Sequence, residues 1–189
     1  MRFFISLILT ILMHETAHLI AAKACKCQVD IFSVGFGKAL FKKKIGKTIY
    51  QIAPILIGGY CQLKDELCYS RSKYAFTNLP YRKKLIISLA GVIINIIAGL
   101  ISLFFGITFG IDFLYYFGAI SFALGITNAL PIPALDGSYP ILVWLEKIYG
   151  KKKGYAKMNR ICSIGFMILM LLNILCLPYL FYLIKIGRL

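Results

Sequence analysis

The chain has 189 residues, of which 60% are hydrophobic, and its formal net charge is +15 at pH 7. Ordinary soluble domains are only about 45–50% apolar, so the composition argues against that class and indicates a membrane protein. The Lys and Arg residues are concentrated in two loop regions, 25–84 and 131–160, which favours contact with anionic lipid over nucleic-acid binding.

Four apolar stretches are long enough to cross a bilayer whose hydrocarbon core is roughly 30 Å thick. They comprise residues 3–22, 85–105, 113–130 and 161–184. We therefore expect an α-helical integral membrane protein with about four transmembrane helices, folded as a single domain over residues 1–189. Basic loops stay in the cytoplasm, so the amino terminus is expected outside, both large loops inside and the carboxyl terminus outside. A cleavable signal peptide is the disfavoured alternative at the amino terminus, because signal cores do not normally contain His-Glu-x-x-His.

The first apolar stretch contains the sequence His14-Glu15-Thr16-Ala17-His18. Residues four apart lie on nearly the same face of a helix, so His14 and His18 can bind one metal ion. Glu15 is placed beside them to take a proton from a water molecule, as in zinc hydrolases. Ionisable residues inside a membrane helix are costly and generally functional, so the pattern predicts a Zn²⁺ site.

Residues 29–63 are rich in β-forming residues interrupted by glycines, which predicts a small β element associated with the membrane. Within it, Lys42-Lys43-Lys44 and Gly46-Lys47 are expected to form a solvent-facing turn between two strands. Residues 65–82 are polar and are expected to form a surface connection to the second span.

A catalytic zinc ion needs three protein ligands and one open position, so the two histidines leave one ligand to be found. Three acidic residues in or next to the spans are candidates, namely Glu15, Asp112 and Asp136. Asp112 lies on the outer side, whereas Asp136 follows two prolines that break the third helix near the cytoplasmic side. At ~1.5 Å per residue, His18 and the end of the third helix both lie roughly 8 Å inside the cytoplasmic surface, which favours Asp136.

Two amide side chains inside the spans need hydrogen-bond partners. Asn95 lies in the middle of the second span, one turn from Gly91, which permits close helix packing. Asn128 lies near the end of the third span and either caps that helix or contacts the substrate. We interpret Asn95 and Asn128 as candidate substrate-binding residues. Residues 137–150 are apolar and aromatic but too short to span, which predicts an interfacial helix.

These motifs occur in the same order in site-2 proteases, the zinc-dependent intramembrane peptidases, which this chain resembles over essentially its whole length. The matching segments are His14–His18, Gly35-Phe36-Gly37, Ile57-Gly58-Gly59-Tyr60, Gly91-x-x-x-Asn95 and Asn128-x-x-Pro131-x-Pro133-x-Leu135-Asp136-Gly137. The resemblance implies that His14, His18 and Asp136 bind Zn²⁺ and that Glu15 is the general base. It is greatest to the bacterial branch that cleaves membrane-bound anti-sigma factors.

The chain departs from that branch in two ways. Val92 stands where the family usually has a proline after the glycine, and only residues 106–112 separate the second and third spans. The short separation leaves no room there for the PDZ domains of the anti-sigma branch. Control of cleavage is therefore expected to involve prior trimming of the substrate or a regulatory partner subunit.

The sequence predicts a zinc-dependent intramembrane endopeptidase that cleaves transmembrane segments of other proteins, as in regulated intramembrane proteolysis. The expected partners are a membrane-protein substrate with a transmembrane helix and the lipid bilayer, in a bacterial cell membrane with the active site toward the cytoplasm. A loosened substrate segment is expected to add as a strand near Gly58, Gly59 and Tyr60. The alternative is a metal permease or sensor that uses the same ligands without proteolysis. A catalytically inactive membrane chaperone is disfavoured by the intact Glu15.

Overall fold

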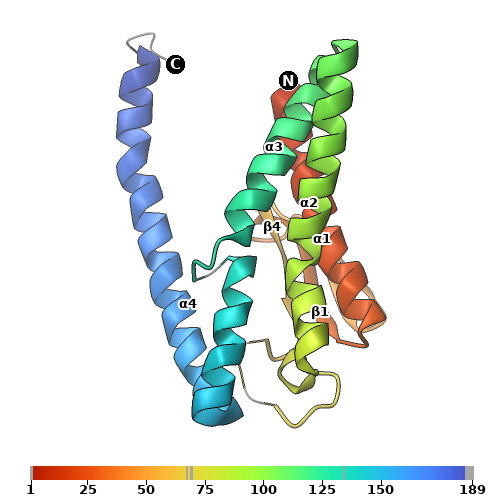
Figure 1. Cartoon of the computed structure of the whole chain (residues 1–189), viewed down its shortest axis with the longest axis vertical. Coiled ribbons are helices and arrows are strands. Elements are labelled where there is room, and N and C mark those ends of the chain that lie inside the picture. The colour runs from red at the N-terminus through yellow and green to blue at the C-terminus, as the bar shows by residue number, and fades with distance from the viewer. Residues whose placement is uncertain (1, 67, 69, 134, 186–189) are drawn as a thin grey trace.

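The structure is a computed structural model that describes residues 2–66, 68, 70–133 and 135–185, with side chains described except at 57, 169–170 and 172–185. The described chain is mainly helical and contains one four-stranded sheet between its first and second helices. Helices α1, α2 and α3 contact one another, the sheet packs against α1, and α4 lies at one edge of the molecule (Figure 1). The prediction of a mostly helical protein with a small sheet after the first helix is confirmed.

Helices α1 (Arg2–Ala24) and α2 (Tyr81–Phe109) are both long enough and apolar enough to cross a membrane. They contain the predicted spans 3–22 and 85–105. Helix α2 begins directly after Pro80 and ends at Gly110, whose φ of 65° is the left-handed conformation that commonly terminates helices. In the part of the chain that the structure describes, these two helices are the ones that meet both criteria.

Helix α3 (Asp112–Ala129) follows α2 after a connection made only of Gly110 and Ile111. A β-carbon on Gly99 of α2 would lie 2.6 Å from the backbone nitrogen of Phe122 on α3. The two backbones can therefore approach closely only because small residues line their interface, as is common between membrane helices. The short connection agrees with the expectation that no domain is inserted between these two helices.

The start of α1 is tied to the start of α3 by an exposed ion pair in which Arg2 donates to Asp112. This contact neutralises one of the basic residues on the side expected to be outside. It also holds Asp112 at the far end of α1 from His18, so Asp112 is excluded as the third metal ligand.

The sheet consists of β1 (Val29–Phe36), β2 (Phe41–Ile45), β3 (Thr48–Ile52) and β4 (Ile55–Leu63). Its strand order is β2-β3-β1-β4, with β1 parallel to β3 and antiparallel to β4. The prediction that Lys42–Lys44 lie in the turn between two strands is wrong, because they are exposed residues of β2. Gly46 and Lys47 form the turn, as predicted. Strand β4 is an edge strand, and it packs against α1.

The connection from β4 to α2 is anchored in the core as well as lying at the surface. Its short 3-10 helix η1 (Phe76–Asn78) contributes Phe76, whose side chain is fully buried. Phe76 belongs to a core that also contains residues of α1, β1 and α4, among them Leu142 and Tyr155. The purely surface location expected for residues 65–82 is therefore corrected.

After α3 the chain passes Pro131 and Pro133 to a 3-10 helix η2 (Asp136–Ser138) and then to α4 (Tyr139–Lys185). Gly150 interrupts α4 with a non-helical φ of 74°, so α4 is two helices that diverge from this point (Figure 1). The first part corresponds to the predicted interfacial helix 137–150. It is fixed to α2 by an ion pair of 2.8 Å between Lys84, which is 2% exposed, and Glu146.

Candidate active site

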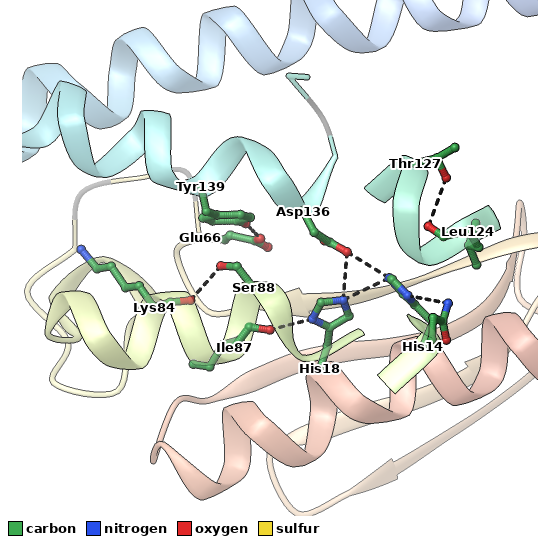
Figure 2. A network of polar contacts seen from close by, with 11 residues as sticks. His14, His18, Glu66, Lys84, Ile87, Ser88, Leu124, Thr127, Asp136 and Tyr139 are labelled. Carbon is green, nitrogen blue, oxygen red and sulfur yellow. Dashed lines mark hydrogen bonds and ion pairs between the residues drawn. The ribbon is translucent and has the colours of Figure 1, made fainter. Parts of the chain in front are cut away.

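Three side chains from distant parts of the chain meet at one point beside α2. Nε2 of His14 lies 3.1 Å from Nε2 of His18, and these atoms lie 3.0 and 3.2 Å from Oδ2 of Asp136 (Figure 2). Both histidines are buried, and the Asp136 side chain is 23% exposed. Among the described residues this is a group of histidine and acidic side chains that could hold a metal ion.

The helical spacing of the histidines brings their rings together, and a further hydrogen-bond partner orients each ring through its Nδ1 atom. Nδ1 of His18 donates a hydrogen bond of 2.8 Å to the backbone carbonyl of Ile87 on α2. Nδ1 of His14 lies 3.1 Å from the side-chain amide of Asn95, which is fully buried. The Nε2 atoms of both rings therefore point toward each other and toward the Asp136 carboxylate. Such second partners are a regular feature of metal-binding histidines.

Gly137, next to Asp136, is needed for space rather than for an unusual backbone angle. A β-carbon there would lie 2.3 Å from the carbonyl oxygen of Ala129 and 2.4 Å from that of Leu130. The residue therefore allows η2 to pack against the end of α3, which places Asp136 beside the histidines.

Glu15 lies between the two histidines and strand β4. The backbone amide of Cys61 on β4 donates a hydrogen bond to the Glu15 carboxylate. A β-carbon on Gly59 would lie 2.9 Å from Cγ of Glu15, so the glycine allows β4 to pack directly against this side chain. The edge strand thus orients the carboxylate next to the histidine pair.

A cavity of about 450 Å³ opens over this group of residues. Its described lining includes the three proposed ligands, Glu15, one side of β4 and the end of α3, with Asn128. Asn95 is fully buried, and its amide contacts His14 instead of facing open space. Of the predicted substrate-binding residues, Gly58, Gly59, Tyr60 and Asn128 line the cavity and Asn95 lies behind His14.

The donor atoms fit a zinc ion in kind and in spacing. Two nitrogen atoms and one carboxylate oxygen form a common set for a catalytic zinc ion with an open position. Two ligands at 2.0–2.1 Å from zinc in tetrahedral geometry are about 3.3 Å apart, close to the 3.0–3.2 Å between these atoms.

Two cavity residues were missed by the sequence reasoning. Glu66, in the connection after β4, and Tyr139, at the start of α4, both line the cavity. The Tyr139 hydroxyl donates a hydrogen bond to the Glu66 carboxylate. Neither residue lies in a recognisable motif, and only the folding of the β4–α2 connection brings them together.

The chain matches a known peptidase family over most of its length. Residues 2–111 and 107–172 match the description "Peptidase family M50". Individual relatives support the same family. A "Putative zinc metalloprotease" of Borreliella burgdorferi is 35% identical over 121 residues, which cover 59% of this chain and 28% of that protein.

Two further relatives have similar coverage. A protein of the same name from Treponema pallidum is 44% identical over 61 residues, covering 32% of this chain and 14% of that protein. The "Regulator of sigma-E protease RseP" of Escherichia coli is 37% identical over 101 residues, covering 50% of this chain and 22% of that protein. This chain thus spans less than a third of the length of each of these relatives. Because the family match extends over most of the chain, the protein belongs to peptidase family M50, the site-2 protease family that its motifs resemble.

Proposed function

We propose that this protein is a zinc-dependent intramembrane endopeptidase that cleaves peptide bonds within transmembrane segments of other membrane proteins. One observation carries the proposal: His14, Glu15 and His18 lie on a helix apolar enough to cross a membrane, and the ligand atoms of the two histidines lie 3.0–3.2 Å from each other and from Asp136. A hydrolytic site in such a helix requires a substrate that is itself in the membrane.

His14, His18 and Asp136 are the proposed zinc ligands, and Asn95 is a positioning residue for His14. A ring nitrogen that binds a metal carries no proton, so Nδ1 of His14 carries the ring proton when Nε2 is the ligand. The amide oxygen of Asn95 must then face Nδ1 to accept a hydrogen bond from it. A half-turn of the amide, which exchanges its oxygen and nitrogen, brings the oxygen to that place.

Glu15 is the proposed general base and acid. Bound zinc supplies Lewis acidity, which makes water a nucleophile near neutral pH and polarises a carbonyl group. Glu15 accepts the proton that water loses as the water oxygen bonds to the scissile carbonyl carbon. Glu15 then donates this proton to the amide nitrogen as the C–N bond breaks, which releases a carboxylic acid and an amine. The hydrogen bond from Cys61 keeps the Glu15 carboxylate directed at the reacting atoms.

Strand β4 is the proposed binding site for the substrate backbone. A substrate helix hides its peptide bonds in internal hydrogen bonds, so it must unwind before cleavage. β4 is at the edge of the sheet, and Gly58, Gly59 and Tyr60 line the cavity that contains Glu15. An unwound substrate segment can add to this edge as a further strand and regain hydrogen bonds. Asn128 faces the same cavity and can bind the substrate backbone from the opposite side.

We further infer that α1, α2, α3 and the second part of α4 span a bacterial cell membrane as four helices of one domain. The basic loops support an orientation with the zinc site toward the cytoplasm. In this orientation the exposed lysines of β2 face the anionic cytoplasmic leaflet. A regulatory partner subunit is the proposed means of controlling access of the substrate.

The experiment that tests this function uses purified protein in proteoliposomes with a mixture of single-span membrane proteins, and mass spectrometry of the products. Wild type is expected to bind one zinc ion per chain and to produce fragments cut within the spans. Glu15→Gln is expected to keep the zinc and lose the fragments, and Asp136→Asn to lose both. Asp112→Asn, which changes an acidic residue distant from the site, serves as the control and should match wild type.

The same variants separate the alternative function. A metal permease or sensor would retain its metal-dependent behaviour in Glu15→Gln, because Glu15 is not a ligand in that function. Zinc binding without any cleavage by wild type, together with zinc uptake into the vesicles, would contradict the peptidase and favour a permease.

A further inference from the structure

The cavity over the proposed zinc site is acidic, although the chain is strongly basic. Three of the seven acidic residues of the chain, Glu15, Glu66 and Asp136, line it. None of the 22 Lys and Arg residues is among its described lining residues. Glu15 and Asp136 have roles in the proposed hydrolysis, whereas Glu66 has none.

Glu66 lies where two cavities adjoin. It lines the cavity over the zinc site together with Tyr139 and Asp136, and these three residues also line a second cavity of about 490 Å³. The second cavity continues toward Met158 and Phe166 on the second part of α4. A chain that passes out of the site in this direction must pass the Glu66 carboxylate, which lies beside Tyr139 next to Asp136 in Figure 2.

The Glu66 carboxylate is held in place by hydrogen bonds. It accepts hydrogen bonds from the Tyr139 hydroxyl and from the backbone amide of Leu63. None of the ion pairs found among the described residues includes Glu66. A divalent ion bound by the histidines and Asp136 would balance the charges of Asp136 and Glu15 and would leave that of Glu66 unbalanced. Burial raises the pKa of Glu66 to about 7, so a cation placed beside it stabilises the ionised carboxylate.

The direction of β4 places Glu66 on the same side of the proposed zinc site as the end of α1. Leu63 at the end of β4 pairs with Val29, which follows shortly after the end of α1 at Ala24. Glu66 therefore lies near the same membrane surface as the end of α1, which the basic loops assign to the cytoplasm. The cytoplasmic flanks of transmembrane segments are enriched in Lys and Arg.

We propose that Glu66 forms a subsite for a Lys or Arg side chain of the substrate, located on the cytoplasmic side of the bond that is cleaved. The inference rests on the proposed function, and it makes Glu66 a specificity-determining residue rather than a catalytic one. Tyr139 orients the carboxylate, and an Arg side chain can bind it with two parallel hydrogen bonds. Substrates with a basic residue at this position are bound and cleaved in preference to neutral ones.

The test uses a series of single-span substrates in proteoliposomes, each with one Lys at one of several successive positions on the cytoplasmic side of the cut. Wild type is expected to prefer Lys over Gln at one position by about 10-fold in kcat/KM, the size of one partly desolvated charge-assisted hydrogen bond. Glu66→Gln keeps a hydrogen-bond acceptor for Tyr139 and removes the charge, so it should lose this preference with unchanged zinc content. Glu66→Lys should reverse the preference toward Glu at the same position.

Tyr139→Phe is the comparison variant, because it removes the orienting hydrogen bond and leaves the Glu66 charge, so the preference for Lys should be reduced but not abolished. A Glu66→Gln variant that lowers cleavage of the Lys and Gln substrates equally would overturn the subsite. The same preferences are measured by substrate binding in the Glu15→Gln background, which does not require turnover. Lys-selective binding without cleavage by wild type would contradict the peptidase and support the subsite, whereas cleavage without Lys selectivity would overturn the subsite alone.

Discussion

Gly91 of α2 lies so close to His18 that a β-carbon on the glycine would be 2.4 Å from Nε2 of the imidazole. The same atom would lie 2.7 Å from Nε2 of His14. Because zinc binds histidine nitrogen at 2.0–2.1 Å, this β-carbon would compete with a metal ion for the space between the rings. Helix α2 therefore forms a wall of the site, and the missing side chain at Gly91 leaves the room for the ion.

Gly91→Ala is expected to weaken zinc binding by at least about 10-fold, because the histidine rings must move away from their shared position. Competition with a zinc chelator measures the effect. Gly99→Ala, two turns along the same helix, is the control, because it disturbs the packing of α2 on Phe122 without contacting the histidines. Equal zinc affinity in wild type and Gly91→Ala would contradict the proposed position of the ion.

Asn95→Leu should weaken zinc binding by about 10- to 100-fold, because it leaves the Nδ1 proton of His14 without an acceptor in a buried position. Asn95→Asp retains an acceptor oxygen and should keep most of the affinity. A substrate-binding role for Asn95 predicts a different result, with a raised KM and unchanged zinc affinity in both variants. Zinc titration together with kcat and KM on one substrate separates the two roles.

Lys84→Met should destabilise the protein by about 3–5 kcal/mol, because it leaves the Glu146 carboxylate without its cation in a largely buried position. This loss corresponds to a Tm lower by roughly 10 °C. The double variant Lys84→Met/Glu146→Leu removes both charges and should recover most of the loss. Arg2→Gln breaks the exposed pair with Asp112 and should change the Tm little. Similar Tm values for Lys84→Met and Arg2→Gln, measured in one detergent, would show that the buried pair does not anchor α4.

The native thiol of Cys61 on β4 provides a direct test of substrate addition to this strand, since Cys61 lines the cavity. In a Glu15→Gln chain whose other cysteines are replaced, Cys61 should form disulfides with cysteines placed along a substrate. Crosslinking should be strongest at alternate substrate positions, because strand side chains point to opposite faces in turn. Moving the thiol to β2, by Cys61→Ser and Lys43→Cys, should abolish the crosslinking. Crosslinking with a helical period of three to four residues would contradict strand addition.

The convergence of His14, His18 and Asp136 could be anticipated because it depends on local rules. A four-residue spacing on a helix fixes the relation of the histidines, and the length of the third helix fixes the depth of Asp136. The same three residues also stand out in the sequence, because they are polar positions within or next to apolar segments. Counting residues along helices therefore predicts that the three side chains lie at a similar depth, whereas the packing of η2 against α3 at Gly137 decides that Asp136 reaches the histidines.

The partners of Asn95 and Glu66 could not be anticipated in the same way. The sequence shows that Asn95 is a polar residue within a span, but not whether its amide faces the substrate or His14. Glu66 lies in a polar connection without a motif, and its contact with Tyr139 depends on how that connection folds. The parallel pairing of β1 with β3 was equally hidden, because strand order depends on contacts between segments rather than on the local pattern. The folded chain alone reveals these contacts.

The donors of the ion come from opposite parts of the polypeptide, since His14 and Asp136 are separated by 122 positions. A growing chain that leaves the ribosome has both imidazoles early but gains the aspartate only after the three preceding helices have been made. Under the proposed function, the nascent protein therefore cannot hydrolyse a peptide bond, its own included, until Asp136 has been made. The order of translation thereby delays the proposed activity until the last of the three donors lies beside the first two.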